Sequence, residues 1–328
     1  MNYLLLIIGF ALLTISADWL INGASGLAKR LNISDLVIGL TIVAFGTSAP
    51  ELVVNIVAAA EGSSDIALTN ILGSNIINTL IILGISATIF PVVCQKSTYH
   101  IEIPISALAG LAVLLLGTNF FGLLHLGESH NGISRLDGLM LLAVFIIFCT
   151  YTIYQGIRNR DASSNESFEA MPIWKSILLI IIGLAGLVVG GELIVNNAVT
   201  IAKSWGVSES VIGVTVVALG TSLPELATSA MAALKKNTDL AIGNVIGSNI
   251  FNVFFVLGLS SIINPLSSYE NIQVDAAMAT GSSLLLLIFI IISRKRSINR
   301  IEGITMLAIY GTYLAWLLTT LYLFLFAL

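Results

Sequence analysis

Ten apolar segments follow one another along the chain, each about as long as a helix needs to cross a membrane. A hydrocarbon core of about 30 Å takes roughly 20 helical residues. The segments are 3–24, 36–60, 67–90, 101–121, 136–156, 173–195, 210–234, 240–263, 275–293 and 303–327. Because 57% of the residues are hydrophobic and only 10% are charged, water cannot be the main solvent of this chain. The sequence therefore predicts an all-α membrane protein with ten transmembrane helices, and the short connections leave no room for a domain outside the bilayer.

The basic residues indicate how these helices are oriented. Cytoplasmic loops of membrane proteins carry an excess of Lys and Arg. With the N-terminus outside, the loops after the odd-numbered spans and their flanks hold 12 of the 14 basic residues. These are Lys29, Arg30, Lys96, Arg158, Arg160, Lys175, Lys235, Lys236, Arg294, Lys295, Arg296 and Arg300. We therefore expect a multi-pass protein of the cell inner membrane with both termini on the non-cytoplasmic side.

A long internal repeat runs through these spans. Residues 34–78 align without a gap with residues 208–252, at a constant offset of 174 positions. The alignment pairs Gly-Thr-Ser-Ala-Pro-Glu at 46–51 with Gly-Thr-Ser-Leu-Pro-Glu at 220–225, and Gly-Ser-Asn-Ile-Ile-Asn at 73–78 with Gly-Ser-Asn-Ile-Phe-Asn at 247–252. Extended backwards, the repeated unit covers about five spans.

An odd number of spans in each copy has a topological consequence. Two such copies in one chain enter the membrane from opposite sides, which is the arrangement of many secondary transporters. We therefore expect two inverted five-helix repeats, at 1–157 and 173–328, joined by a cytoplasmic linker at 158–172.

Each copy places a helix breaker and a carboxylate in the middle of an apolar helix. Pro50 has no N–H to donate to the carbonyl of Gly46, and its ring disfavours helical geometry at Ala49. We expect the second span to break at this point, and the seventh to break at Pro224. Backbone carbonyls freed inside a membrane are tolerated where they line a cavity or find another partner, and a metal cation is such a partner.

The polar residues around these breaks share faces of helices. Helical spacing puts Ala44, Thr47 and Glu51 on one face of the second span. Ser74 and Asn78, four residues apart, share a face of the third span. Their counterparts in the second copy are Ala218, Thr221, Glu225, Ser248 and Asn252. Folded together, the two sets would present carboxylate, hydroxyl, amide and carbonyl oxygens, which suit Ca²⁺ and Na⁺ and lack the ligands that zinc or copper prefer.

Four further acidic residues lie near the ends of spans. Asp18 and Glu192, which the same offset aligns, could line a vestibule or meet lipid headgroups. Asp65 and Asp239 precede helices, so we expect them to be N-caps. The two cysteines and three histidines show no metal-binding spacing, so no zinc site or disulfide is expected.

The paired Gly-Thr-Ser-x-Pro-Glu and Gly-Ser-Asn-Ile-x-Asn segments resemble the alpha repeats of the cation/calcium exchanger superfamily, and the whole chain looks like a prokaryotic sodium/calcium exchanger. The resemblance implies that Glu51 and Glu225 are the main calcium ligands, completed by the carbonyls of Thr47 and Thr221. It also implies flanking sodium sites. Their ligands would be the carbonyls of Ala44 and Ala218 together with Ser48, Ser74, Ser222 and Ser248.

The same resemblance places Asn78 and Asn252 at the centre of the site. Potassium-dependent members of the superfamily, and some others, have an aspartate where this chain has Asn252. We therefore expect no dependence on potassium. The neutral amide leaves open how many sodium ions replace one calcium ion.

These features predict a secondary active antiporter that exchanges Na⁺ for Ca²⁺ by alternating access. The two ions are its transported substrates and the bilayer is its surroundings; no cofactor, nucleic acid or protein partner is expected. A Ca²⁺/H⁺ antiporter is the alternative, because protons can also discharge buried carboxylates. A cation channel would use similar oxygen ligands but would conduct without a counter-ion. An enzyme is disfavoured because no mid-membrane His or Lys accompanies the two carboxylates.

Overall fold

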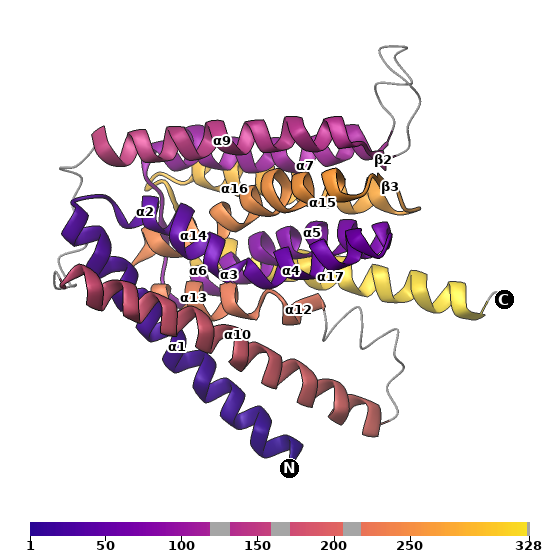
Figure 1. Ribbon diagram of the computed structural model, residues 1–328, viewed down its shortest axis with the longest axis horizontal. Helices are drawn as coiled ribbons and strands as arrows, with labels where there is room; N and C mark the ends of the chain where they lie inside the picture. The colour runs from indigo at the N-terminus through magenta and orange to yellow at the C-terminus, as the bar shows by residue number, and fades with distance from the viewer. Residues whose placement is uncertain (119–131, 159–170, 206–217, 327–328) are drawn as a thin grey trace.

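The computed structural model describes residues 1–118, 132–158, 171–205 and 218–326 (Figure 1). Within these ranges, eight helices are long and apolar enough to cross a membrane, and a bent pair, Asp35–Thr47 and Ala49–Ala60, makes up a ninth span. The remaining predicted span, 210–234, begins outside the described residues. Large apolar side chains on the outer helices are exposed, as Ile147 is at 68%, which is expected where lipid is the solvent. The chain is therefore an integral, multi-pass membrane protein.

The first half of the described chain, residues 1–158, is almost entirely helical. Its elements are α1 (Asn2–Leu31), α2 (Asp35–Ile38), η1 (Gly39–Val43), α3 (Ala44–Thr47), α4 (Ala49–Ala60), α5 (Ser64–Ile77), η2 (Asn78–Ile82), α6 (Leu83–Ile89), β1 (Val92–Val93), η3 (Thr98–Glu102), α7 (Ile103–Gly117), β2 (Gly132–Ile133) and α9 (Arg135–Arg158), where η marks a π-helical segment. α1 ends because Asn32 takes the left-handed conformation at φ 53° and its N–H reaches the carbonyl of Lys29. The hydroxyl of Ser34 then accepts the N–H of Val37 and starts α2.

The described parts of the second half, 171–205 and 218–326, repeat much of this order. Their elements are α10 (Ile173–Ser204), α12 (Ala218–Gly220), α13 (Leu223–Leu234), α14 (Thr238–Ile250), η5 (Phe251–Leu257), α15 (Gly258–Ile263), β3 (Leu266–Ser267), α16 (Ile272–Ile292), β4 (Ser297–Ile298) and α17 (Arg300–Phe326). A π-helical segment thus follows the Gly-Ser-Asn motif in both halves, because η2 begins at Asn78 and η5 contains Asn252.

α5 and α14 begin with caps that differ from those expected. Asp65 and Asp239 are not the N-caps. The cap residues are Ser63 and Asn237, each two positions earlier in the chain. The side chain of Asn237 accepts a backbone N–H of the first turn. Both aspartates lie in the first turn, where the helix dipole favours negative charge, and Asp239 accepts a hydrogen bond from Gln95 at 2.6 Å.

Loops from both halves meet at the two ends of the helices. At one end β1 pairs antiparallel with β4, Asn237 donates to Asp35 at 2.9 Å, and Gln95 donates to Asp239. The loops after the first, third, seventh and ninth spans therefore lie together. At the other end β2 pairs with β3. The segments that carry most of the basic residues share the first end, where α1 and α9 end and α10 begins in Figure 1.

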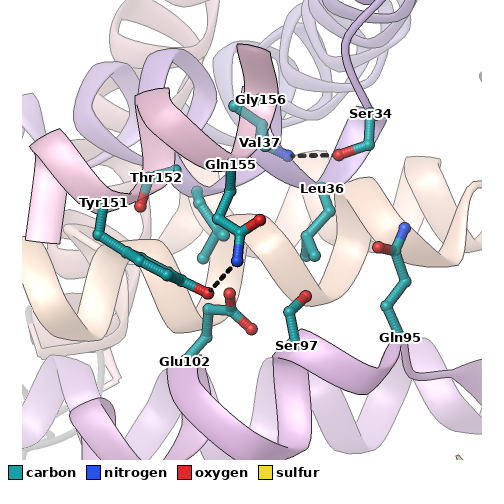
Figure 2. A pocket seen from close by; sticks show the side chains of 11 residues that line it. Ser34, Leu36, Val37, Gln95, Ser97, Glu102, Tyr151, Thr152, Gln155 and Gly156 are labelled. Atoms are coloured by element: carbon teal, nitrogen blue, oxygen red, sulfur yellow. Dashed lines mark hydrogen bonds between the residues drawn. The ribbon is translucent and has the colours of Figure 1, made fainter. Parts of the chain in front are cut away.

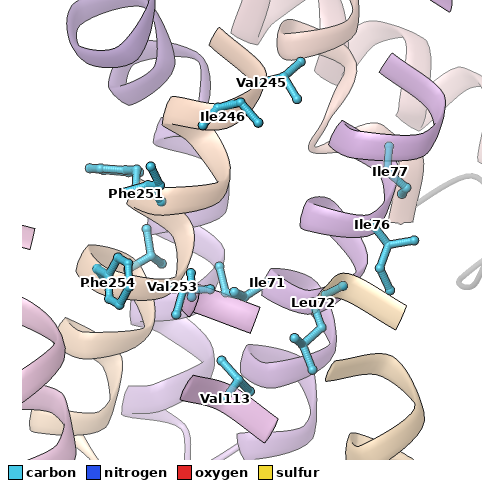
Figure 3. Packing of buried hydrophobic residues seen from close by; sticks show 14 of the residues in the cluster. Ile71, Leu72, Ile76, Ile77, Val113, Val245, Ile246, Phe251, Val253 and Phe254 are labelled. Atoms are coloured by element: carbon cyan, nitrogen blue, oxygen red, sulfur yellow. The ribbon is translucent and has the colours of Figure 1, made fainter. Parts of the chain in front are cut away.

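The two halves cover each other. α6 of the first half packs against α17 of the second, α9 of the first packs against α15 of the second, α7 lies against α16, and α1 lies against α10. The spans Ser64–Ile89 and Thr238–Ile263 are the most enclosed. In their most apolar stretches, 72% and 78% of the residues are buried. Figure 3 shows the apolar side chains of α5, α7, α14 and η5 gathered in this core. The two helices that carry the Gly-Ser-Asn motif therefore form the centre of the molecule.

Phenylalanines fix the broken helix against this centre. The ring of Phe45 in α3 stacks on Phe251 at 4.8 Å between centroids, and Phe251 stacks on Phe255 at 4.9 Å. Phe145 of α9 packs against Phe45 at 5.4 Å. The cluster holds α3 beside η5, so the first helix break and the central asparagines are positioned by the same apolar contacts.

Candidate functional site

Two helix breaks position the carboxylates. The first separates α3 from α4 at Ser48 (φ −84°, ψ 11°), and the second separates α12 from α13 at Ser222 (φ −87°, ψ 4°). The expected breaks are present, but the first lies one residue earlier than predicted, since Ala49 is already helical. The proline that follows fits in the first turn, where N–H groups have no partner within the helix. Glu51 and Glu225 consequently lie in first turns, where the helix dipole favours a carboxylate.

The two glutamates are buried and are held by serines from both halves. Glu51 is 1% exposed and Glu225 is 0% exposed. Each Oε1 atom accepts one hydrogen bond from its own half and one from the other half. The four bonds run from Ser48 to Glu225 (2.7 Å), from Ser248 to Glu225 (3.5 Å), from Ser222 to Glu51 (3.5 Å) and from Ser74 to Glu51 (3.4 Å). Neither Oε2 atom has a hydrogen-bond partner.

Four asparagines on α5, η2, α14 and η5 form a network beside the glutamates. The Nδ2 of Asn78 donates to Oδ1 of Asn249, and the Nδ2 of Asn252 donates to Oδ1 of Asn75, both at 3.1 Å. The repeat offset relates these two bonds to each other. Because the amide nitrogens of Asn78 and Asn252 are engaged in this way, their Oδ1 atoms are turned elsewhere and have no hydrogen-bond partner.

Several of the polar residues that shape the site were not assigned a role from the sequence. Asn75 and Asn249 fix the orientation of the amides of Asn78 and Asn252. Both belong to the aligned motif, so the internal repeat is the sequence feature that could have identified them. Asn244 is fully buried, accepts from Thr47 at 3.1 Å and donates to Ser229 at 2.9 Å. It ties α14 to the residue before the first helix break.

The remaining predicted residues lie around the breaks. The carbonyl of Ala44 accepts the hydroxyls of Thr47 at 3.3 Å and of Ser248 at 3.5 Å. The hydroxyl of Thr221 is buried and has no hydrogen-bond partner. Ala218 is the first residue of α12, and its side chain lies outside the described residues. The structure thus brings the predicted glutamates, serines and asparagines together from four helices.

An open cavity of about 330 Å³ borders the two breaks between α4, α10 and α13. Pro50 and Thr221 line its wall at the breaks, and Glu192 of α10 lines it as well. Of the two expectations for Glu192, lining a vestibule or meeting lipid headgroups, the cavity supports the first. The aligned partner of Glu192 differs, because Asp18 forms an ion pair with Lys235 at 2.6 Å.

The chemistry of this arrangement is that of a cation site. Two buried carboxylates give a formal charge of −2, and hydroxyl, amide and carbonyl oxygens surround them. A buried charge is stable only when it is paired or coordinates a metal ion. Oxygen ligands of this kind are the ones that Ca²⁺ and other hard cations prefer.

Known proteins are similar in sequence to this chain over nearly its whole length. The family model described as sodium/calcium exchanger protein matches residues 1–154 and 175–319. The sodium/calcium exchanger MaX1 of Methanosarcina acetivorans is 34% identical over 349 residues, which cover 95% of this chain and 97% of that protein. The inner membrane protein YrbG of Escherichia coli is 34% identical over 330 residues, covering 95% and 94%.

The fold also matches a solved relative. A structure of the sodium-calcium exchanger NCX_Mj superposes with a TM-score of 0.81 at 34% sequence identity, covering 96% of this chain and 97% of the other. The chain therefore belongs to the family of sodium/calcium exchanger proteins, which are membrane transporters and not enzymes.

Proposed function

We propose that this protein is a secondary active antiporter that exchanges Na⁺ for Ca²⁺ by alternating access. The observation that carries the proposal is a set of four buried side-chain oxygens without hydrogen-bond partners. They are Oε2 of Glu51, Oε2 of Glu225, Oδ1 of Asn78 and Oδ1 of Asn252. A buried acceptor without a donor costs about 1–3 kcal/mol, and more if it is charged. Cations bound between the two halves would supply the partners that these oxygens lack.

The roles of individual ligands belong to the same proposal. Ca²⁺ takes roughly 6–8 oxygens, so Glu51 and Glu225 would be its main ligands, joined by the carbonyls of Thr47 and Thr221. Sodium ions would bind on either side. Their ligands would be the carbonyls of Ala44 and Ala218 with Ser48, Ser74, Ser222 and Ser248, while Asn78 and Asn252 lie at the centre.

Charge neutralisation explains why such a site exchanges ions without leaking them. Closing the protein over two ionised carboxylates is costly unless positive charge is enclosed with them. One Ca²⁺ or several Na⁺ meet that condition, and an empty site does not. The conformational change is then coupled to occupancy, and sodium moving down its gradient drives calcium out of the cytoplasm.

The organisation of the chain in the membrane is part of the proposal. Ten spans arranged as inverted repeats, 1–157 and 173–328 with the linker 158–172, agree with the two ranges matched by the family model and with the paired hydrogen bonds at the site. The gathering of basic loops at one end supports a cytoplasmic location for that end. Both termini would then face away from the cytoplasm of an inner-membrane protein.

α1 and α10 are the proposed moving part. Their contact is the most extensive between any two described elements. A Cβ atom added at Gly183 of α10 would lie 2.8 Å from the backbone nitrogen of Leu20, and one at Gly190 would lie 3.0 Å from that of Leu13. The two backbones therefore touch without intervening side chains. Because both helices also contact α13, movement of the pair would open or cover the second helix break.

Calcium uptake into vesicles tests the exchange. Purified protein is reconstituted in liposomes loaded with Na⁺, and the liposomes are diluted into choline buffer with radiolabelled calcium. We expect uptake that requires the outward Na⁺ gradient and persists when a protonophore removes any pH gradient. Uptake driven by a pH gradient in the absence of Na⁺ would contradict sodium coupling and support the Ca²⁺/H⁺ alternative.

A matched pair of substitutions ties the activity to the site. Glu51→Gln removes one negative charge between the halves, and we expect it to abolish calcium uptake. Glu61→Gln makes the same chemical change at an exposed position just after α4 and should leave uptake unaltered. Full activity of folded Glu51→Gln protein would refute the assignment.

A further inference from the structure

A further buried carboxylate lies outside the exchange site. Glu102 is the last residue of η3, near the start of the span Thr98–Gly117. Its side chain is 3% exposed, and its Oε2 atom has no hydrogen-bond partner. A carboxylate buried in this way is unfavourable unless something neutralises it or binds to it. The proposed exchange makes no use of this residue.

Glu102 borders a small polar pocket of about 40 Å³ at the end of the molecule where the basic loops gather. The polar part of its lining includes Ser34, Gln95, Ser97, Glu102, Tyr151 and Gln155. Figure 2 shows the carboxylate of Glu102 beside the phenol of Tyr151, pointing toward Gln155, whose amide donates to that phenol at 3.1 Å. Polar residues of three separate segments therefore line the pocket that holds one unpartnered carboxylate oxygen.

The second half has an acid one position before the equivalent of Glu102, and that acid is bound in a different way. The repeat offset carries Glu102 to the residue after Asp275, which lies in the first turn of α16. Tyr313 donates to one oxygen of Asp275 at 2.6 Å, and Tyr269 donates to the other. Tyr269 aligns with Gln95 in the first half. Two phenols thus satisfy both oxygens of Asp275, whereas Oε2 of Glu102 has no hydrogen-bond partner.

The size and charge of the pocket restrict what it can hold. Among the described residues of its lining, Glu102 is the one acid and none is a lysine, arginine or histidine. Gln95 is engaged with the carboxylate of Asp239 at 2.6 Å. A water molecule needs roughly 10–15 Å³ of cavity volume, so the pocket has room for a small ion and a few water molecules. A single carboxylate balances a single positive charge, and Ca²⁺ needs roughly 6–8 oxygens.

We propose that this pocket binds one monovalent alkali cation, held by the carboxylate of Glu102 and by the hydroxyl and amide oxygens around it. The bound ion joins the start of α2 at Ser34 to η3 and to the end of α9. α2 continues through η1 into α3, which carries Ala44 and Thr47. Occupancy of the pocket therefore stabilises the segment that leads into the exchange site.

Thermal unfolding in a background without the exchange carboxylates tests the proposal. Purified protein carrying Glu51→Gln and Glu225→Gln is heated in choline chloride and in lithium, sodium or potassium chloride at equal ionic strength. We expect a saturable rise of Tm with at least one alkali chloride, because a ligand that binds only the folded state stabilises it. Adding Glu102→Gln should remove the rise, whereas adding Glu61→Gln should preserve it.

Two results would overturn the proposal. One is a Tm that does not differ between alkali and choline chloride in the background protein, which would mean that the pocket holds only water or a proton on Glu102. The other is an alkali effect that Glu102→Gln leaves intact. Should Glu102→Gln fail to fold, Gln155→Leu keeps the carboxylate but removes a neutral ligand, and it must weaken the apparent affinity by roughly tenfold. Because the background lacks the exchange carboxylates, these outcomes are independent of calcium uptake.

Discussion

Ser48 and Ser222 occupy equivalent positions at the two helix breaks, and each donates to the glutamate of the other half. The two bonds are unequal, since Ser48 lies 2.7 Å from Oε1 of Glu225 and Ser222 lies 3.5 Å from Oε1 of Glu51. The first distance is typical of a strong bond between a hydroxyl and a carboxylate, and the second is at the limit of hydrogen bonding. The two copies of one motif therefore give two different local environments.

This inequality predicts different effects of the same substitution. Ser48→Ala should lower the free energy of unfolding by about 1.5–3 kcal/mol, because it leaves a buried carboxylate oxygen with only the long bond from Ser248. Ser222→Ala should cost less than about 1 kcal/mol. Thermal unfolding in ion-free detergent measures both, and equal losses of Tm would contradict the expected order.

Asn75 supports a second prediction at this scale. Its Oδ1 accepts from Asn252 and its Nδ2 donates to the carbonyl of Asn249, both at 3.1 Å. Asn75→Ala should destabilise the protein by about 1–3 kcal/mol and weaken calcium binding, because the amide of Asn252 loses its orientation. Asn70→Ala, on the same helix, is the control, since the Nδ2 of Asn70 has no hydrogen-bond partner to lose. Calorimetric calcium titration with both variants measures the difference.

The sequence predicts some residues of the site together with their role, and others without a role. Glu51 and Glu225 are recognisable because an acid beside a helix breaker in an apolar span is costly wherever it lies. Asn75 and Asn249 belong to the repeated motif, but the sequence alone indicates no role for them. Their function depends on which amide atom faces the opposite half, and that contact between distant segments has no local signature.

At the scale of elements, helix breaks and π-helical segments shape the site together. A break caused by Pro50 is predictable because the missing N–H is a property of that residue alone. η2 and η5 were not predicted, since their sequences are as apolar and regular as those of ordinary helices. π-helical turns are frequent at functional sites, and here they adjoin Asn78 and Asn252. Both segments pack against helices of the other half.

The close contact of α1 and α10 predicts how glycine substitutions act. A Cβ atom at Gly183 would lie 2.8 Å from the backbone nitrogen of Leu20 and 2.9 Å from the carbonyl oxygen of Ser16. Gly183→Ala should therefore separate the helices, lower stability by about 1–3 kcal/mol and slow exchange. Gly281→Ala in α16 has nothing within 4 Å of the added atom and should be neutral or stabilising by up to about 1 kcal/mol. A similar loss of Tm in both variants would contradict the proposed contact.

At the scale of the whole molecule, membrane crossing was the most predictable property. Nine of the ten expected spans correspond to a long apolar helix or bent helix pair among the described residues, and the basic loops described there meet at one end. The way the halves cover each other was not predictable. Helix packing in lipid depends on small residues and shape, because lipid is as apolar as the helix surfaces, so no stripe of hydrophobic residues marks the partner.

Accessibility of single cysteines checks the proposed orientation. In a Cys149→Ser background, Lys295→Cys should react with an impermeant maleimide only from the cytoplasmic side, and Ser267→Cys only from the opposite side. Both positions are exposed and lie at opposite ends of the helices. The reverse labelling pattern would contradict the orientation drawn from the basic residues.

The remaining thiol should not interfere with that measurement. Burial, with a further contribution from Asp239, raises the pKa of the Cys94 thiol to about 12. The thiolate is the reactive form, so it is scarce at every pH well below that value and increases only as the pH approaches 12. Labelling of the Cys149→Ser parent at pH 7–8 should therefore be negligible, and rapid labelling there would show that Cys94 is exposed.

The mutual covering of the halves bears on how the protein is made. α17 closes over α6 so tightly that a Cβ atom at Gly84 would lie 3.1 Å from the carbonyl oxygen of Gly303. During synthesis α6 leaves the ribosome more than 200 residues before α17 does. The surface of α6 that contacts α17 is therefore exposed to lipid until α17 has been translated. Nascent chains cut short before the final helix would accordingly be recognised by membrane proteases, whereas two separately translated halves that meet in one bilayer could still assemble.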